Sequence, residues 1–135
     1  MKLIATLSLA GFAVATSAVA QPRPGDAAPA VALTGAQVYE NVCQACHMPN
    51  AKGAVGAGRI ASLAGNANLK YPEYPIGVVT GGKGAMPWFR GQLTDQQIAD
   101  VITYVRTHFG NNYKAKVTVA QVADGGVPAP HEYER

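Results

Sequence analysis

Both cysteines of the chain stand in one short stretch, "VCQACHMP". Cys43 and Cys46 are separated by two residues, and His47 follows directly. The spacing Cys-x-x-Cys-His is typical of the covalent attachment of c-type haem. Two thiols on one helical turn reach the two vinyl groups along one porphyrin edge, and the next residue places an imidazole under the iron. The pattern therefore predicts thioether bonds at Cys43 and Cys46 and a proximal iron ligand at His47.

Other uses of a cysteine pair explain these residues less well. A thioredoxin-type pair needs a βαβ context, which the chain does not indicate. A structural zinc site needs about four ligands, and His108 and His131 do not form a second pair. A Cys43–Cys46 disulfide suits an exported protein, but it leaves the adjacent His47 unexplained.

The opposite axial position needs a second ligand, and the candidates are methionine, histidine, water or none. Met48 adjoins His47 and cannot reach the other face. His108 is expected near the end of a helix, at a partly exposed polar position, and His131 lies near the C-terminus. Met86 lies in the glycine-rich stretch "GKGAMPWF", where Pro87 fixes the local φ and stiffens the loop. A lone methionine usually fills a core, but the haem motif upstream favours Met86 as the distal ligand.

Two helices are predicted around these residues. One spans about 35–46, with Thr34 as N-cap and Gln37 completing a capping box. The other spans 95–109, where Thr94 and Gln97 form a second capping box. Gly110 is expected to end it at the C′ position. Apolar residues at i, i+3, i+4 and i+7 mark its buried face: Ile98, Val101, Ile102 and Val105.

The remaining chain is predicted to be mostly loop. Residues 49–68 and 81–89 are rich in glycine and should follow the haem closely. A short helix is expected over 73–80, and residues 116–122 fit either a strand or a short helical turn. Aromatic residues make up only 7% of the chain, so a buried porphyrin would fill much of the interior.

The N-terminus has the pattern of an export signal. Lys2 precedes an apolar run that ends in Ser17-Ala18-Val19-Ala20, which predicts a signal peptide over 1–20 rather than a membrane anchor. An extended leader rich in proline and alanine follows at 21–33. The formal charge is +3, and loss of Lys2 lowers it to +2, with no basic run. The charge therefore gives no reason to expect nucleic acid as a partner, and no stable membrane insertion is expected.

The chain resembles a class I cytochrome c, of the small bacterial monohaem type, over residues 34–110. The matching stretches are "GAQVYENVCQACH", "SLAGN", "GKGAMPWF" and "LTDQQIADVITYVRTHFGN". The resemblance implies an all-α fold, with three to five short helices wrapped around one covalent haem. It also implies thioether bonds at Cys43 and Cys46 and axial ligation by His47 and Met86. Residues 111–135 would then form a tail beyond the fold.

The resemblance implies two further structural features. Its first and last helices cross near a glycine and two aromatic residues, and Gly35, Tyr39 and Tyr104 fit these places. Its members commonly have a proline before the "LAG" segment, whose carbonyl accepts the N–H of the proximal histidine. This chain has "RIASLAG" there, with Ala61 near the position of the proline. The residue that supplies the carbonyl is therefore left open.

The expected function is one-electron transfer in the periplasm, by a protein that is not an enzyme. A closed site with two protein ligands binds no substrate, and a thioether ligand favours ferrous iron. The sequence around "LAGN" and "GAMPWF" is similar to that of cytochromes that accept electrons from periplasmic dehydrogenases. A terminal oxidase or another cytochrome would receive the electron. Two alternatives stay open: a haem subunit fixed within a dehydrogenase complex, and an open-site haem sensor or enzyme.

Further residues are expected around the haem. Candidates to contact the propionates are Arg59, Tyr71, Trp88 and Arg90. An exposed haem edge would serve for docking, since weak redox encounters use small interfaces. The residues expected around that edge are Val42, Gln44, Ala45, Ala85 and Pro87, with Lys52 and Lys83 beside them.

Overall fold

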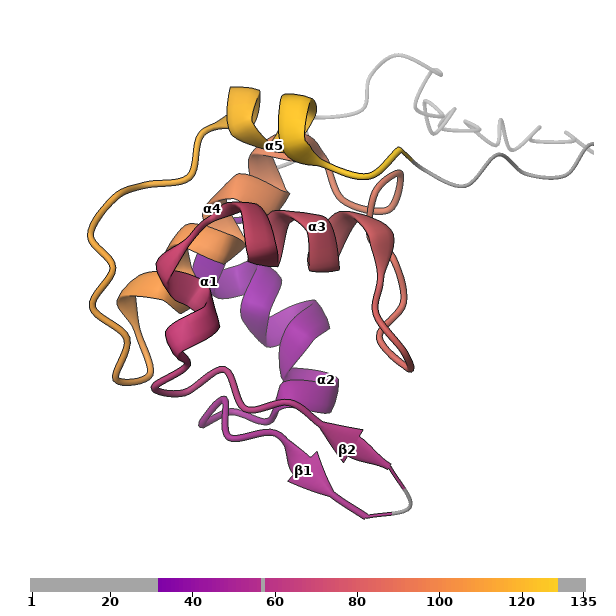
Figure 1. The fold of residues 1–135 in the computed structure, drawn as a ribbon, viewed down its shortest axis with the longest axis vertical. Coiled ribbons are helices and arrows are strands. Elements are labelled where there is room, and N and C mark those ends of the chain that lie inside the picture. The colour runs from indigo at the N-terminus through magenta and orange to yellow at the C-terminus, as the bar shows by residue number, and fades with distance from the viewer. Residues whose placement is uncertain (1–31, 57, 129–135) are drawn as a thin grey trace, which may run out of the picture. The chain divides into compact units, whose positions relative to one another are not determined.

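The computed structural model describes residues 32–56 and 58–128. The predicted signal peptide and nearly all of the leader lie outside them, as does His131. Helices dominate the described part (Figure 1), as predicted. In chain order the elements are α1 (Gly35–Val38), a π-helical segment (Tyr39–Cys43), α2 (Gln44–His47), β1 (Ala54–Val55), β2 (Arg59–Ile60), a 3₁₀ helix (Ala67–Lys70), α3 (Glu73–Gly81), α4 (Asp95–Thr107) and α5 (Val119–Gly125).

The first three elements form one continuous helix, which confirms the helix predicted over 35–46. The Thr34 hydroxyl accepts a hydrogen bond from the Gln37 N–H at 3.3 Å, and the Gln37 side chain accepts one from the Thr34 N–H at 2.9 Å. This is the predicted capping box. The helix ends after His47, because Met48 has a φ of 68° and leaves the helical region.

Helix α4 also begins as predicted, with a capping box between Thr94 and Gln97. Its end differs from the prediction. The helix stops at Thr107, His108 is extended, and the left-handed C′ residue is Phe109, with a φ of 56°. Gly110, the predicted C′ residue, comes one position later and also has a positive φ. The Phe109 ring packs 4.8 Å from the Tyr39 ring, which offsets the unfavourable backbone conformation.

Helices α1 and α4 cross at Gly35. A Cβ atom there would overlap the Asp100 carbonyl and lie 3.1 Å from the Tyr104 Cβ, so only glycine allows this approach. The rings of Tyr39 and Tyr104 lie 5.8 Å apart beside the crossing. The structure thus confirms the helix crossing that the resemblance implied.

The stretch 49–68 has more regular structure than predicted. Strands β1 and β2 pair antiparallel, with Ala54 opposite Ile60, and the 3₁₀ helix follows at Ala67–Lys70. Strands of two residues leave no alternating pattern in the sequence, so periodicity could not find them. Later in the chain, α3 confirms the short helix predicted over 73–80.

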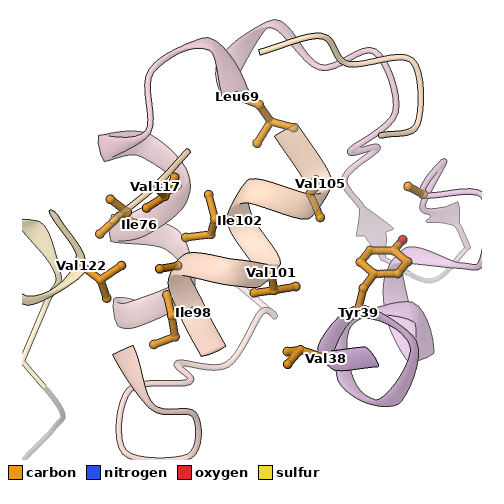
Figure 2. Packing of buried hydrophobic residues seen from close by; sticks show 12 residues of the cluster. Val38, Tyr39, Leu69, Ile76, Ile98, Val101, Ile102, Val105, Val117 and Val122 are labelled. Carbon is orange, nitrogen blue, oxygen red and sulfur yellow. The ribbon is translucent and has the colours of Figure 1, made fainter. Parts of the chain in front are cut away.

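Residues 111–128 pack on the helical core. Thr118 caps α5 through a third capping box with Gln121, a Thr-x-x-Gln signal that sequence reading missed. Figure 2 shows Val122 of α5 directed toward Ile76 and Ile98, and Val122 is fully buried. The tail is therefore part of the packed domain as far as Val127.

The core lies between α1, α3, α4 and α5 (Figure 2). Helix α4 supplies its centre, and the stripe predicted from periodicity is buried throughout. Val38 and Tyr39 close it on the side of the first helix. Among the described residues, no helix is long and apolar enough to cross a membrane.

Candidate functional site

His47 lies at the end of α2 and is 8% exposed. Its Nδ1 atom lies 3.0 Å from the Ala61 carbonyl oxygen. A carbonyl only accepts, so Nδ1 carries the proton, and in the neutral ring Nε2 has the lone pair. No hydrogen bond joins Nε2 to any described residue. This identifies the carbonyl that sequence reading left open, and it leaves a metal-binding nitrogen free.

The turn after His47 is strained and tightly bonded. Met48 and Ala51 both have positive φ values, 68° and 57°. The Tyr39 hydroxyl donates to the Met48 carbonyl at 2.8 Å, and the Gly53 N–H donates to the His47 carbonyl at 3.1 Å. Residues rarely adopt such conformations unless the surroundings impose them. These bonds fix the chain direction on both sides of the imidazole.

Cys43 and Cys46 both precede His47 on the same helix, and no disulfide joins them. Cys46 is exposed, whereas Cys43 is half-buried where the π-helical segment joins α2. Burial raises the pKa of the Cys43 thiol to about 11, although a hydrogen bond from its own backbone lowers it slightly. Before haem attachment, Cys43 is therefore a neutral thiol near pH 7. The two sulfurs and the imidazole lie within five consecutive residues.

Met86 lies in a loop that we name the methionine loop, residues 82–89. Its side chain is half-buried. The backbones of Lys83 and Met86 exchange hydrogen bonds of 3.0 and 3.1 Å, which close a tight turn. Gly82 has a φ of 74°, and a Cβ atom there would lie 2.8 Å from the Met86 carbonyl oxygen. The loop thus needs glycine at its start.

The four residues predicted to contact the propionates differ in their exposure and in their contacts. Arg59 is exposed on β2, Tyr71 is 63% exposed and Trp88 is 46% exposed. Arg90 instead extends to the tail, where its Nη2 donates to the Val122 carbonyl at 2.6 Å. The structure therefore gives Arg90 a structural partner that the propionate prediction did not include.

His108, one of the alternative axial ligands, is exposed just beyond the end of α4. Its Nδ1 lies 2.8 Å from the Tyr104 carbonyl, and the two rings stack at 4.1 Å. These contacts hold the imidazole against the last turn of α4.

Two buried polar residues that sequence reading missed hold the framework together. Arg106 is 3% exposed and donates to the carbonyls of Leu69, Lys70 and Ala115 at 2.9, 3.2 and 2.5 Å. Asn111 donates to the Leu63 carbonyl at 2.8 Å. Arg106 follows Ile98 by eight residues and so lies on the apolar face of α4. A charged residue at such a position could have indicated a buried, bonded arginine.

The donor set fits haem c. Thiols at i and i+3 and an imidazole at i+4 lie on one helix end, and the imidazole has a defined tautomer with a free Nε2. The Met86 thioether lies in a separate loop and is of a type that could serve as a second iron ligand. Exposed aromatic rings at Tyr71 and Trp88 suit contact with a large apolar ring.

Comparison with known proteins agrees with this chemistry. Residues 30–105, more than half of the chain, match the family described as "Cytochrome C oxidase, cbb3-type, subunit III". The chain belongs to the cytochrome c family, as a class I monohaem member. This cytochrome is an electron-transfer protein, not an enzyme, and it uses covalently bound haem c.

Individual relatives are of two kinds. The cytochrome is 42% identical over 75 residues to cytochrome c6 of Leptolyngbya boryana, covering 55% of this chain and 88% of that protein. For cytochrome c6 of Nostoc sp., the identity is 38% over 107 residues, with 78% of this chain and 92% of that protein covered. It is also 40% identical over 108 residues to the gluconate 2-dehydrogenase cytochrome c subunit of Pantoea cypripedii, covering 67% of this chain. The chain spans about a quarter (23%) of the length of that subunit.

Proposed function

We propose that Cys43 and Cys46 form the thioether bonds to haem c, and that His47 and Met86 are the axial ligands. The observation that supports this best is the His47 Nδ1–Ala61 hydrogen bond, because it leaves Nε2 as the ligand atom. Met86 lies in the methionine loop, far in sequence from the continuous helix Gly35–His47, which we call the attachment helix because it carries Cys43 and Cys46. Met48 directly follows His47 in a strained turn, and Tyr39 holds its carbonyl.

A haem with both axial positions filled by protein changes its oxidation state without binding substrate. The residues of this chain supply the conditions for that change. His47 and Met86 stay bound to the iron in both oxidation states, and the buried residues around His47 limit structural rearrangement. The cytochrome then exchanges one electron at a time with partner proteins.

Voltammetry of the purified holoprotein tests this function. We expect one reversible one-electron wave, and a covalent haem that survives denaturing electrophoresis. Replacement of Cys43 or Cys46 by alanine should leave a single thioether, and replacement of both should abolish haem retention on the gel. A wave that involves two electrons, or haem that separates from the wild-type chain on denaturation, would contradict the proposal.

We propose the periplasm as its location, because residues 1–20 have the pattern of an export signal. A periplasmic dehydrogenase is the proposed donor, and a terminal oxidase or another cytochrome the proposed acceptor. The match to a dehydrogenase cytochrome subunit supports the donor class. The match along nearly the full length of cytochrome c6 proteins supports a free carrier.

A second candidate is a haem subunit fixed within a dehydrogenase complex, favoured by the 40% identity to such a subunit. Gentle purification from the periplasmic fraction separates the two candidates. A free carrier should elute alone at the size of one chain. Stable co-elution with a dehydrogenase would favour the fixed subunit.

The proposed docking surface surrounds the attachment helix and the methionine loop. Ala45, Ala85 and Pro87 are exposed apolar residues, and Val42 and Gln44, close to Ala45 in the sequence, are half-buried. Lys52 and Lys83 add exposed positive charges, and the Lys83 Nζ lies over the Tyr74 ring at 5.1 Å. The proposed propionate contacts stay Arg59, Tyr71, Trp88 and Arg90, of which Arg90 also bonds the Val122 carbonyl.

A further inference from the structure

The tail segment, which we define as residues 118–128, contacts both ends of the methionine loop. The Val127 N–H donates to the Thr80 hydroxyl at 2.8 Å, just before the loop begins. The Arg90 guanidinium donates to the Val122 carbonyl at 2.6 Å, just after the loop ends. One short stretch of chain therefore connects the two points from which the loop that contains Met86 departs.

The contact at the start of the loop is buried and well bonded. Thr80 is fully buried, and its hydroxyl donates to the Ile76 carbonyl at 2.7 Å. Its remaining acceptor capacity is used by the Val127 N–H. The Val127 side chain lies against Gly81, where an added Cβ atom would be 2.8 Å from a Val127 methyl group. The end of α3 is thus fastened to the tail segment by a hydrogen bond and by close packing.

The contact at the end of the loop is charged. Arg90 Nη1 lies 3.6 Å from an Asp95 carboxylate oxygen, while Nη2 bonds the Val122 carbonyl. A Cβ atom at Gly126 would lie 2.5 Å from the Val122 carbonyl oxygen and would also meet the guanidinium, so glycine is required there. Val122 itself is fully buried in the core, which gives its carbonyl a fixed position. Arg90 thus joins the loop to a rigid point.

The loop between these contacts is bonded at its tip and at its two ends. The Gly82 N–H donates to the Val78 carbonyl at 2.9 Å, and the Trp88 carbonyl accepts from Gln92 Nε2 at 2.7 Å. Lys83 and Met86 close the turn at the tip, and the Phe89 N–H donates to the Val79 carbonyl at 2.9 Å. We infer that the tail segment positions Met86, by tying both ends of the methionine loop, and so slows its departure from the iron. Arg90 and Thr80 are positioning residues in this arrangement. The inference rests on the proposed ligation by Met86.

The physical reason is that an axial methionine leaves the iron only when its loop moves. Each tie adds a hydrogen bond that must stretch or break during that movement. Without the ties, the loop keeps its tip turn and the bonds of Gly82 and Phe89 to α3, but the segments at its two ends lose their connection to the tail segment. Exogenous ligands should then replace the methionine faster.

Two substitutions remove the ties separately. Thr80→Val keeps the size of the side chain but loses the acceptor for Val127, and Arg90→Met keeps a long apolar stem but loses the bond to Val122. Thr80→Val has no connection with a propionate, so it isolates the tail contact. The matched control is Thr34→Ala, which removes the N-cap of α1 and destabilises the fold without touching the loop or the tail segment.

The probe is imidazole added to the ferric holoprotein, followed by stopped-flow absorbance. We expect each variant to bind imidazole roughly fivefold to tenfold faster than wild type, and the double variant faster still. Amide hydrogen exchange should report faster exchange at Val127 and Phe89 in both variants. Thr34→Ala should leave the imidazole rate within about twofold of wild type.

Imidazole rates in Thr80→Val and Arg90→Met that match Thr34→Ala would overturn the inference, while leaving Met86 as ligand. The proposed ligation fails in a different way. In that case the wild-type ferric protein lacks the far-red band of methionine ligation before any substitution is made. The two failures are therefore distinguishable in the same samples.

Discussion

The His47 Nδ1 atom lies 3.0 Å from the Ala61 carbonyl oxygen, and Gly53 is the residue that makes room for this pair. A Cβ atom at Gly53 would lie 2.7 Å from the Ala61 oxygen and closer still to the Ile60 oxygen. Gly53 also has a φ of 66°, which other residues adopt only at a cost. The orientation of the His47 imidazole thus depends on a glycine at position 53, beside the β1–β2 hairpin.

Gly53→Ala is expected to displace the Ala61 carbonyl and weaken its bond to His47. An imidazole that donates to a carbonyl is a stronger electron donor, so losing the bond should raise the reduction potential. The free energy of unfolding should fall by about 2 kcal/mol. Voltammetry and denaturant titration measure the two effects. Gly58→Ala, in open space on the same hairpin, is the control and should change neither.

Gly35→Ala should destabilise the protein by about 3 kcal/mol or more, because the added methyl overlaps the backbone of α4 at Asp100. Gly77→Ala is the matched control on α3, since a methyl group added there would meet no neighbouring residue within 4 Å. That change should stabilise by about 0.5–1 kcal/mol through the unfolded chain. Equal effects of the two substitutions in chemical denaturation would contradict the proposed role of the helix crossing.

Arg106→Met should lower the free energy of unfolding by about 3 kcal/mol, because three backbone carbonyls lose their charged donor. Lys114→Met, at a position on the surface outside this network, should change it by less than about 0.5 kcal/mol. Thermal and denaturant unfolding provide the measurement. A small effect of Arg106→Met would mean that water replaces the guanidinium at these carbonyls.

The stability of the fold should fall in alkaline solution through Tyr39. Burial is the main cause that raises the pKa of Tyr39 to about 12, with a smaller contribution from Tyr104; the contribution of Cys43 applies only to the chain before haem attachment. The folded pKa lies above the unfolded value of 10.0, so the stabilisation is complete below pH 10 and is lost as the pH rises toward 12. Tyr39→Phe should remove this part of the pH dependence. The exposed Tyr71→Phe is the control, and an identical alkaline slope in wild type and Tyr39→Phe would contradict the assignment.

Sequence reading succeeded where local signals were strong. Two capping boxes and a periodic apolar stripe identified the first helix and α4, and the Cys-x-x-Cys-His motif identified the cofactor class. It failed where structure depends on distant packing. The end of α4 differs from the prediction because the Phe109 ring packs on Tyr39. The bond from Arg90 to the carbonyl of the buried Val122 was not foreseen. Neither contact leaves a local pattern.

The proposed electron-transfer site depends on Met86 closing the iron site opposite His47. The most direct test is the visible spectrum of the ferric holoprotein, followed by carbon monoxide added to the ferrous form, for wild type and Met86→Ala. Ligation by Met86 predicts a weak far-red band and no carbon monoxide binding in wild type, with the band lost and carbon monoxide bound rapidly in Met86→Ala. Rapid carbon monoxide binding by the wild-type protein, without the far-red band, would contradict the claim and indicate an open haem site.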